Sequence, residues 1–528
     1  MNTPQPKQSL APVTRATTES PVVIVGAGPG GLTCALELAR QGVPTLVVDA
    51  DCRVGGIAQT AEYKGFRFDI GGHRFFTKVP AVAELWRAML GPDFIRRPRL
   101  SRIYYNKKFF DYPLKPLNAL MNLGLVSSVA ILASYCWSNL RPIRPEVSFE
   151  DWVSNRFGRR LYKTFFETYT EKVWGIPCRT ISAQWASQRI KGLSLKTAVI
   201  NMLFPTLNRR GGQTVKTLID EFEYPRLGPG MMWEAFAREI ERLGGRIELN
   251  TRVTRLHHDD GMVTAVEMQR DGMRIMQPAT HVISTMPVRE LLGSLEPAAP
   301  DDARGAANRL KYRDFLTVAL IVDEPDVFAD NWIYVHDETV KVGRIQNFKN
   351  WSPDMVPDQS QTCLGLEYFC TVGDDLWAMS DADLVELGKK ELAEIGLARF
   401  DRILDGTVVR MPKAYPVYDE GFTDALAEAR QYVERFRNLQ LIGRNGTHKY
   451  NNQDHSMVMA MLAVRNLFGE QHDLWAVNAD DEYHEEVAEH REQTTTSPLS
   501  ADLKNLASTQ PLVPTQVASG PVVGSGRV

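Results

Sequence analysis

The first residues whose types and spacing point to chemistry form a glycine-rich turn near the start of the chain. The turn, Gly26-Ala-Gly-Pro-Gly-Gly31, stands between an apolar run at 21–26 and a helical pattern at 32–41 that ends at Gly42. Glycines at such a turn allow a tight bend and let backbone amides approach a phosphate. A GxGxxG pattern alone is weak, but between a strand and a helix it predicts a dinucleotide-binding loop.

A carboxylate follows the loop at the spacing that this kind of site requires. A second apolar run, 45–48, ends at Asp49 and completes a strand–helix–strand unit of about thirty residues. We expect Gly26 to form the turn, Gly28 to admit the pyrophosphate, and Gly31 to let the helix pack closely. Asp49 is then placed to accept hydrogen bonds from ribose hydroxyls.

Two further glycine pairs distinguish FAD from NAD as the dinucleotide. Gly55-Gly56 follows Asp49 after five residues, and Gly71-Gly72-His73 follows Asp69. In flavoproteins of this type the first pair opens the chain around the ribityl and pyrophosphate groups. The second brings backbone alongside the isoalloxazine ring, where a Cβ would clash. We therefore expect a glutathione-reductase-like FAD-binding Rossmann domain, with His73 facing the flavin or, as the alternative, serving in a local turn.

Composition bounds what the rest of the chain can be. Its 528 residues are too many for one core, so two or more domains are expected. The net charge of −3 argues against general binding of nucleic acid. Six scattered cysteines without a CxxC pair favour a reducing, cytoplasmic compartment and no zinc or other metal site. The polar tails, 1–19 and 490–528, are expected to be disordered, and the oligomeric state stays open.

Periodicity places further elements along the chain. Helices are expected over 173–188 and 381–394, and strands over 244–253, 281–285, 317–322 and 363–370. A basic cluster formed by Arg96, Arg97, Arg99 and Arg102 either holds phosphate groups or is a solvated surface.

An apolar stretch at 117–140 is long enough to cross a bilayer. It also carries asparagine and serine residues, among them Asn118, Asn122, Ser127, Ser128, Ser134 and Asn139. Because it lies inside the expected catalytic part of the chain, we expect a buried helix. A membrane span and peripheral contact with a membrane are the alternatives.

Motifs spread along most of residues 20–470 carry a family resemblance. They are Gly71-Gly-His73, Lys172-Val-Trp-Gly-Ile-Pro177, Trp185 with Arg189, Tyr224-Pro-Arg-Leu-Gly-Pro-Gly230-Met-Met-Trp233, Ile283-Ser-Thr285, Arg344 with Asn350-Trp-Ser352, Tyr415-Pro416 and Gly443-Arg-Asn-Gly-Thr-His-Lys-Tyr-Asn-Asn-Gln-Asp-His-Ser456. Together they resemble UDP-galactopyranose mutases, especially the eukaryotic type, within the FAD-dependent amine oxidase and protoporphyrinogen oxidase-like superfamily. The Asn-Gln-Asp-His-Ser string is the most specific of them.

The resemblance implies an α/β fold in which a discontinuous FAD-binding domain carries an inserted, mixed α+β substrate domain. The expected ranges are 20–80, 215–290 and 405–470 for the first domain, and 81–214 and 291–404 for the second. It also implies a nucleotide-sugar substrate and pyranose–furanose interconversion, a step of polysaccharide biosynthesis without net redox change. In that family N5 of reduced flavin forms an adduct with the sugar, so FAD would act in its reduced form, with NAD(P)H as a candidate reductant.

Site residues are carried over one position at a time. The resemblance implies that Arg189 and Arg344 bind the substrate diphosphate and assist catalysis, in which His73 is also expected to take part. Around the same diphosphate it implies the tyrosines Tyr334, Tyr415 and Tyr450. For the loop that closes over the flavin it implies Arg444, Asn452, Gln453 and Asp454.

Three departures from the family pattern leave the nucleotide base and the sugar open. Tyr450-Asn-Asn-Gln453 is shorter than the eukaryotic pattern, Trp351 stands where a tyrosine is usual, and Leu114-Lys115 replace an aromatic and an amide after Tyr112-Pro113. The alternative function is that of an FAD-dependent oxidase or desaturase of the amine oxidase or protoporphyrinogen oxidase type, because fold alone does not separate the two. A flavin-binding protein without catalysis is a third alternative.

Overall fold

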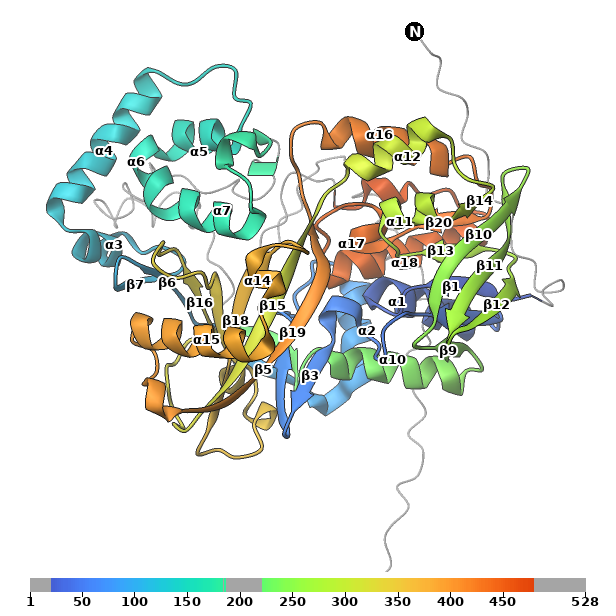
Figure 1. Ribbon diagram of the computed structural model, residues 1–528, viewed down its shortest axis with the longest axis horizontal. Coiled ribbons are helices and arrows are strands. Elements are labelled where there is room, and N and C mark those ends of the chain that lie inside the picture. Colours follow the sequence, from blue (N-terminus) through green and yellow to red (C-terminus); the bar gives the residue numbers. More distant parts are fainter. Residues whose placement is uncertain (1–19, 184, 187–220, 479–528) are drawn as a thin grey trace, which may run out of the picture.

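The computed structural model describes residues 20–183, 185–186 and 221–478 (Figure 1). The expected disordered tails lie outside these residues, as does all of 187–214, which includes Arg189. In Figure 1 a parallel sheet covered by helices lies at the right of the molecule, and a longer sheet lies to its left. A group of helices, α4 to α7, forms the upper left corner.

The apolar runs around the glycine-rich turn form a parallel sheet. Five strands of the described chain take part, in the order β20-β13-β1-β2-β9. Their bounds are Val22–Val25 for β1, Thr45–Val48 for β2, Arg246–Glu248 for β9, Val282–Ser284 for β13 and Leu439–Leu441 for β20. Both faces are covered, which explains why β1 and β2 are apolar at nearly every position rather than alternating with polar residues.

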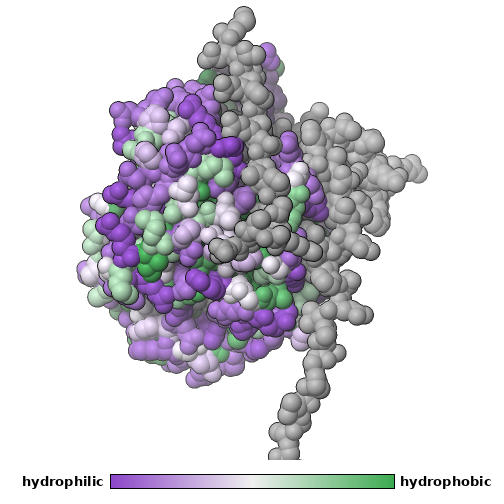
Figure 2. Space-filling view, turned by 90° about the vertical axis from the view of Figure 1, so that its right-hand side faces the viewer, coloured by the Kyte–Doolittle hydropathy of each residue, from purple (hydrophilic) through white to green (hydrophobic). Residues whose placement is uncertain are grey.

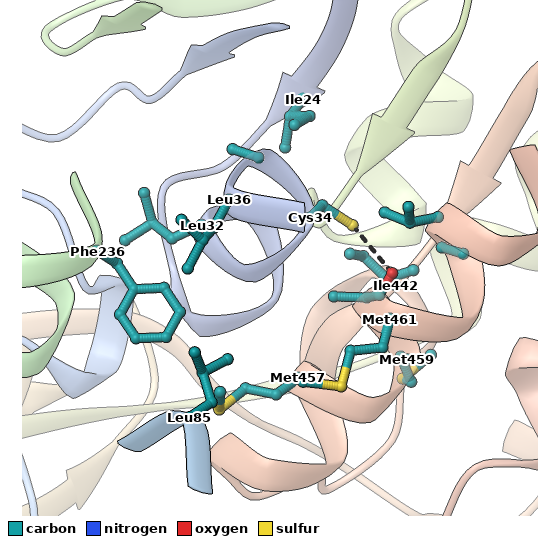
Figure 3. Close-up of a cluster of buried hydrophobic side chains, with 14 of the residues drawn as sticks. Ile24, Leu32, Cys34, Leu36, Leu85, Phe236, Ile442, Met457, Met459 and Met461 are labelled. Carbon is teal, nitrogen blue, oxygen red and sulfur yellow. Dashed lines mark hydrogen bonds between the residues drawn. The ribbon is translucent and has the colours of Figure 1, made fainter. Parts of the chain in front are cut away.

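Three helices cover one face of this sheet. The helix after the turn, α1 (Pro29–Arg40), packs against α10 (Gly230–Arg242) and α18 (Gln453–Leu467). Figure 3 shows the apolar side chains that fill the space between them, with Ile24 of β1 and Met457 of α18 among them. The Cys34 thiol donates to the Ala460 carbonyl at 3.5 Å, which ties α1 to α18 directly.

The other face packs on a second layer of helices and a small sheet. The helices are α11 (Val288–Gly293), α12 (Asp301–Arg309) and α16 (Phe422–Val433). Within the described ranges the small sheet has the order β12-β11-β10-β14, with bounds Met273–Pro278, Met262–Arg270, Arg252–Asp259 and Leu295–Glu296. Figure 2 views this side of the molecule, where hydrophobic residues are scattered among hydrophilic ones.

The longer sheet is mixed. Seven strands of the described chain form it, in the order β19-β15-β18-β17-β16-β6-β7. Their bounds are Ile403–Pro416, Tyr312–Val322, Thr362–Cys370, Arg344–Asn347, Trp332–Val335, Ser101–Tyr105 and Lys108–Asp111. One face is covered by α15 (Asp381–Ile395), as predicted for 381–394. The fold is the expected α/β type, a Rossmann-like FAD domain joined to a mixed α+β part.

Two segments lie on the other side of the predicted domain boundaries. β19 hydrogen-bonds with β15 in the long sheet, although residues from 405 onward were assigned to the FAD-binding domain. α12 packs in the core of the parallel sheet, although 291–404 was assigned to the substrate domain. The chain therefore crosses between the two sheets near residues 310 and 416.

Further short elements lie around the two sheets. They are the hairpin of β3 (Thr60–Tyr63) and β4 (Phe66–Asp69), the pair of β5 (Phe94–Pro98) and β8 (Glu221–Pro225), α2 (Pro80–Leu90), α13 (Phe348–Trp351), α14 (Asp375–Ala378) and α17 (Gly443–Gly446). The helical group contains α3 (Pro116–Leu123), α4 (Leu125–Leu140), α5 (Phe149–Phe157), α6 (Arg159–Tyr162), a π-helical turn at Lys163–Glu167 and α7 (Thr168–Trp174).

The prediction of a buried helix over 117–140 is wrong. The stretch forms two helices, α3 and α4, which meet at Gly124 with a bend of 115°. Of the sixteen residues in α4, Ile131 is buried, and large apolar side chains such as Val126 are exposed. No single helix among the described residues is long and apolar enough to cross a membrane, and α3 with α4 meets that test only as a bent pair.

Two further element predictions need correction. The expected strand over 244–253 is divided between β9 and β10, because Asn250 takes a left-handed conformation with φ of 52°. The expected helix over 173–188 is interrupted: α7 ends at Trp174, where Gly175 adopts φ of 67°, and among the described residues helical structure returns at 183 and 185–186.

Candidate functional site

A cavity of about 570 Å³ lies where the two sheets meet. Its wall is contributed by the start of α1, the loop after β4, α7, β17, the end of β19 and the start of α18. These segments are far apart in the sequence, and the predicted site residues in the described ranges are distributed among them.

The glycine-rich turn forms one end of the cavity. Gly26 has φ of 105°, and a Cβ at Gly31 would lie 1.8 Å from the Gly26 carbonyl oxygen. Gly28 differs, because its backbone is extended and a Cβ there would meet nothing closer than Gly56 Cα at 3.9 Å. Gly26 and Gly31 therefore hold the turn and helix together, whereas Gly28 faces open space.

Asp49 lies beside this turn and is fixed by two backbone amides. Its carboxylate oxygens accept hydrogen bonds from the Ala27 N–H at 2.7 Å and the Asp51 N–H at 2.9 Å. Burial raises the pKa of Asp49, and these amide bonds act in the opposite direction. Gly55 and Gly56 follow in left-handed conformations, and Gly56 lines the cavity.

The loop after β4 forms the adjoining wall. Gly71, Gly72 and His73 all line the cavity. A Cβ at Gly72 would lie 2.7 Å from Nε2 of Gln346, so this loop packs directly on the long sheet. A side chain at Gly72 would therefore push the loop away from the strand that carries Arg344.

His73 both faces the cavity and stabilises its own turn, so the two alternatives for it are compatible. Its Nδ1 lies 2.9 Å from the Gly71 carbonyl oxygen, which can only accept, so Nδ1 carries the proton and Nε2 is an acceptor. Burial lowers the pKa of His73 to about 3; the charges of Arg444 and Arg344 also lower it, and the bond to Gly71 opposes them. The imidazole is therefore neutral at physiological pH.

The start of α18 lines the cavity beside the start of α1. Asn452 caps the helix in a reciprocal capping box with His455, whose Nδ1 accepts from the Asn452 N–H at 3.1 Å. Gln453 accepts a hydrogen bond from Trp233 Nε1 at 3.1 Å, and Asp454 is buried in the first turn. Both α1 and α18 thus begin at the cavity, where helix N-termini favour negative charge.

Arg444 is held in place by the chain around it. Its guanidinium donates to the carbonyls of Asn451 at 3.0 Å and Ala414 at 2.9 Å, and it lies 4.7 Å from the ring centre of Tyr450. Tyr450 in turn stacks on Tyr415, with ring centres 5.5 Å apart. These three residues form one aromatic and cationic wall.

Arg344 lines the cavity and is also the partner of a fully buried carboxylate. Its Nε donates to Glu367 Oε2 at 2.7 Å, and Nη2 donates to the same oxygen. Burial acts to lower the pKa of Arg344, but the Glu367 carboxylate and nearby tyrosines outweigh it and the pKa is raised. Arg344, which is predicted to bind the substrate diphosphate, is therefore permanently charged and rigidly oriented.

Sequence reasoning missed several lining residues. Tyr169, Thr170, Val173 and Trp174 line the cavity from α7, at the i, i+4 spacing of one helix face. This spacing, next to the motif at 172–177, was the available signal. Burial raises the pKa of Tyr169, so its hydroxyl stays protonated beside Arg344.

The basic cluster of the sequence is divided by the structure. Arg99 lines the cavity and lies 5.3 Å from the ring centre of Trp332, where Arg74 also stacks at 4.8 Å. Arg97 donates to the Asn350 carbonyl, and Arg102 pairs with buried Asp330. Arg99 is therefore the member placed at the cavity. Tyr334 also lines the cavity, as expected, and Arg189 lies outside the described residues.

The wall fits an FAD molecule. The open space in front of Gly28, at the start of α1, suits a pyrophosphate, and the Asp49 carboxylate stands beside it. The left-handed backbone at Gly71 and the close approach at Gly72 leave a flat backbone wall that a side chain would fill. When bound, FAD would be held by the start of α1, Asp49, the loop at 71–73 and the start of α18.

These features define a flavoenzyme with a Rossmann-type FAD domain and a mixed sheet on the far side of the cofactor. The chain belongs to the family described as flavin containing amine oxidoreductase, which matches residues 29–418. It is accordingly an FAD-dependent enzyme of the oxidoreductase type.

Individual proteins similar to this chain differ in what they do. A phytoene desaturase (lycopene-forming) of Pantoea ananas is 26% identical over 282 residues, which cover 49% of this chain and 54% of the relative. The chain thus spans about half the length of this curated relative. Among solved structures, reduced UDP-galactopyranose mutase has a TM-score of 0.75 at 20% identity, covering 88% of this chain and 97% of that one. Putrescine oxidase bound to putrescine has a TM-score of 0.57 at 18% identity, covering 85% and 99%.

Replacing Gly28 and Gly31 should separate cofactor binding from folding. Gly28→Val leaves the backbone unstrained but places a side chain in the open space before α1, so purified protein should be folded and lose most of its FAD. Gly31→Ala should lower the free energy of unfolding itself by about 1–3 kcal/mol, because its Cβ meets backbone. Gly293→Ala, which meets nothing within 4 Å, is the control. Urea melts measure the free energy of unfolding of each variant, and flavin absorbance measures its FAD content. Full FAD content in Gly28→Val would contradict the assignment of this loop.

The buried His73 should make stability fall as the pH falls. Its folded pKa, about 3, lies below the unfolded value of about 6.5, so between these values the unfolded state binds the extra proton. Each pH unit below about 6.5 should cost up to about 1.4 kcal/mol from this group. Urea melts of wild type and His73→Gln with saturating FAD, from pH 7.5 to 5, should therefore converge as the pH is lowered. Parallel curves would show that His73 titrates normally.

Proposed function

We propose that this protein is a nucleotide-sugar mutase that interconverts the pyranose and furanose forms of a UDP-galactose-like substrate. The charge of the cavity wall supports this most directly. Four arginines line it: Arg74, Arg99, Arg344 and Arg444. The lining carboxylates in the described chain, Asp49 and Asp454, belong to the dinucleotide-binding end.

This charge distribution favours an anionic substrate. Guanidinium groups match the oxygens of a diphosphate in a forked geometry and bind it with charge-assisted hydrogen bonds. An alkylamine would enter as a cation and meet like charge. A hydrocarbon polyene would displace water from a charged wall and offer it no electrostatic interaction in return.

The described side chains can hold such a substrate around its diphosphate. Arg344 and Arg99 would contact the phosphates, and the hydroxyls of Tyr334, Tyr415 and Tyr450 can donate hydrogen bonds to their oxygens. Reduced FAD would supply a nucleophilic ring nitrogen. Neutral His73, with Nε2 as an acceptor, can orient a sugar hydroxyl without adding a further positive charge. Arg189 is part of this proposal by resemblance alone.

The alternative, an FAD-dependent oxidase or desaturase, is favoured by the family assignment and by the relative named phytoene desaturase. The likeness to reduced UDP-galactopyranose mutase supports the mutase instead, through a fold that the two types share. An oxidase or desaturase consumes an electron acceptor, whereas a mutase makes no net redox change. An assay of the reaction therefore distinguishes the two proposals.

A panel of nucleotide sugars tests the proposed function. Dithionite-reduced protein incubated with UDP-galactopyranose, UDP-galactofuranose and other nucleotide hexoses should exchange ring forms catalytically, as followed by chromatography. The oxidised protein should be inactive, because its flavin lacks the nucleophilic electron pair. Turnover of an amine or polyene by oxidised protein, with hydrogen peroxide or a reduced acceptor formed in step, would replace the mutase proposal by the alternative.

Arg344 should contribute to substrate binding beyond its ion pair with Glu367. Arg102 provides a matched control, because it pairs with a fully buried carboxylate, Asp330, away from the cavity. Changing both members of each pair, as Arg344→Gln with Glu367→Gln and Arg102→Gln with Asp330→Asn, avoids a stranded charge that would cost about 3–5 kcal/mol.

UDP affinity should then fall about ten- to a hundredfold in the first double variant and stay within about twofold in the second. Equilibrium titration of UDP against reduced protein measures this, with FAD content and melting curves recorded alongside. Equal affinities in the two double variants would mean that Arg344 serves only as a structural partner of Glu367.

A further inference from the structure

The two helices at 116–140 expose their apolar sides. Val126 is 84% exposed and Leu140 is 78% exposed, and their neighbours on the same side are similar. Together these residues form the α3–α4 face: Leu117, Met121, Leu125, Val126, Val129, Leu132, Trp137 and Leu140. In Figure 1, α4 lies at the outer edge of the molecule, on the side opposite the small sheet of β10, β11 and β12.

The opposite, inward sides of both helices carry polar groups with specific bonds, beside smaller apolar contacts made by Leu123 of α3 and Ile131 of α4. On α3, Asn118 accepts from the Asp111 N–H at 3.0 Å, and Asn122 donates to the Phe109 carbonyl at 2.9 Å. On α4, the Ser134 hydroxyl oxygen accepts from the Arg160 N–H at 3.1 Å. Amphipathic helices of water-soluble proteins point their polar side outward, and here the order is reversed.

Close packing also fixes this orientation. A Cβ at Gly158, between α5 and α6, would lie 2.7 Å from the backbone nitrogen of Tyr135, so α4 sits directly on the chain beneath it. Rotating α4 to bury its apolar side would break this contact and the bond to Ser134. The apolar side is therefore built to face outward.

The helix pair itself carries no negative charge, although Lys115 at its start pairs with Asp111 at 3.3 Å. Between residues 112 and 145 the sequence contains no aspartate or glutamate, and its basic residues are Lys115, Arg141 and Arg144. They stand at the two ends of the helix pair. The Arg141 guanidinium lies 4.8 Å from the ring centre of Trp137, an aromatic type that prefers the membrane–water interface.

We propose that the α3–α4 face docks this protein on the surface of a bilayer that contains anionic phospholipids. The apolar side chains enter the boundary between headgroups and acyl chains, and Arg141 and Arg144 meet the lipid phosphates. The bend of 115° between the helices keeps both of them at the surface rather than across the bilayer.

A second copy of the chain fits this face less well. In a two-fold contact the same patch meets itself, so the arginines of both copies would be buried together. No acidic residue between 112 and 145 is present to pair with them. Anionic lipid satisfies both the apolar side chains and the charges.

The docking face adjoins the cavity but does not depend on the proposed reaction. Tyr112 lines the cavity, with its ring centre 5.2 Å from that of Tyr334, and α3 begins four residues later at Pro116. A docked protein would thus hold this wall of its cavity close to the membrane, whatever the substrate.

Vesicle flotation with the full-length, FAD-loaded protein tests the proposal. Wild type should float with vesicles of phosphatidylglycerol and phosphatidylcholine, and much less with phosphatidylcholine alone. Changing Leu125, Val126 and Leu140 to Ser should reduce the vesicle partition coefficient about tenfold or more. Met273→Ser with Met276→Ser on β12, exposed on the opposite side, is the matched control and should bind like wild type.

Arg141→Gln with Arg144→Gln isolates the electrostatic part. This variant should lose about tenfold or more in partitioning to anionic vesicles and little on neutral ones. Flavin absorbance and far-UV circular dichroism confirm that each variant is folded. Wild type that remains unbound at every lipid composition, or a serine variant that binds equally well, would overturn the proposal. So would a wild-type dimer, seen by sedimentation velocity without lipid, that the serine variant dissociates.

Discussion

The carboxylate of Glu367, buried in the middle of the long sheet, connects the two sides of the cavity. Its oxygens accept from Arg344 on the neighbouring strand and from Gln346 Nε2 at 2.8 Å. A buried carboxylate is costly unless both oxygens are satisfied, so these partners must be in place for the sheet to form. Gln346 in turn packs against Gly72, at the flavin side of the cavity. The direction of Arg344 relative to the cofactor loop is therefore fixed by folding itself.

This network also accounts for one departure from the mutase pattern. Trp351 stands where a tyrosine is usual, yet it is fully buried and is not a lining residue. Its indole N–H is shared between the Gln346 amide oxygen at 3.1 Å and the Asn331 carbonyl at 3.0 Å. Trp351 thereby orients the side-chain amide of Gln346 so that Nε2 of Gln346 points toward Glu367. The substitution changes the layer that supports Arg344 rather than the wall that would meet a substrate.

Interactions between residues close together in the chain could be predicted from the sequence, and those between distant residues could not. The turn at Gly26–Gly31 and its carboxylate lie within one short unit, so spacing alone placed them. Glu367 could not be found in this way, because it sits in an apolar run and acquires its role through strand register with Arg344. The prediction of a buried helix over 117–140 failed for a different reason. Periodicity separates their serines and asparagines from their apolar residues, but it does not say which side meets the protein.

Burial, together with the positive charge of the cavity wall, keeps His73 neutral. The starts of two helices and four arginines make the wall favourable for anions along its length, which suits the pyrophosphate of FAD and a second diphosphate. Burial lowers the pKa of His73 to about 3, and repulsion of an imidazolium by Arg444 and Arg344 acts in the same direction. Because Nδ1–H is committed to Gly71, the ring offers its Nε2 lone pair to the cavity. The side chains of Tyr169 and Tyr415 are likewise neutral, since burial raises their pKa. In the proposed function, fixed charge would therefore bind the substrate, while the groups beside the flavin would act through hydrogen bonds rather than through ionisation.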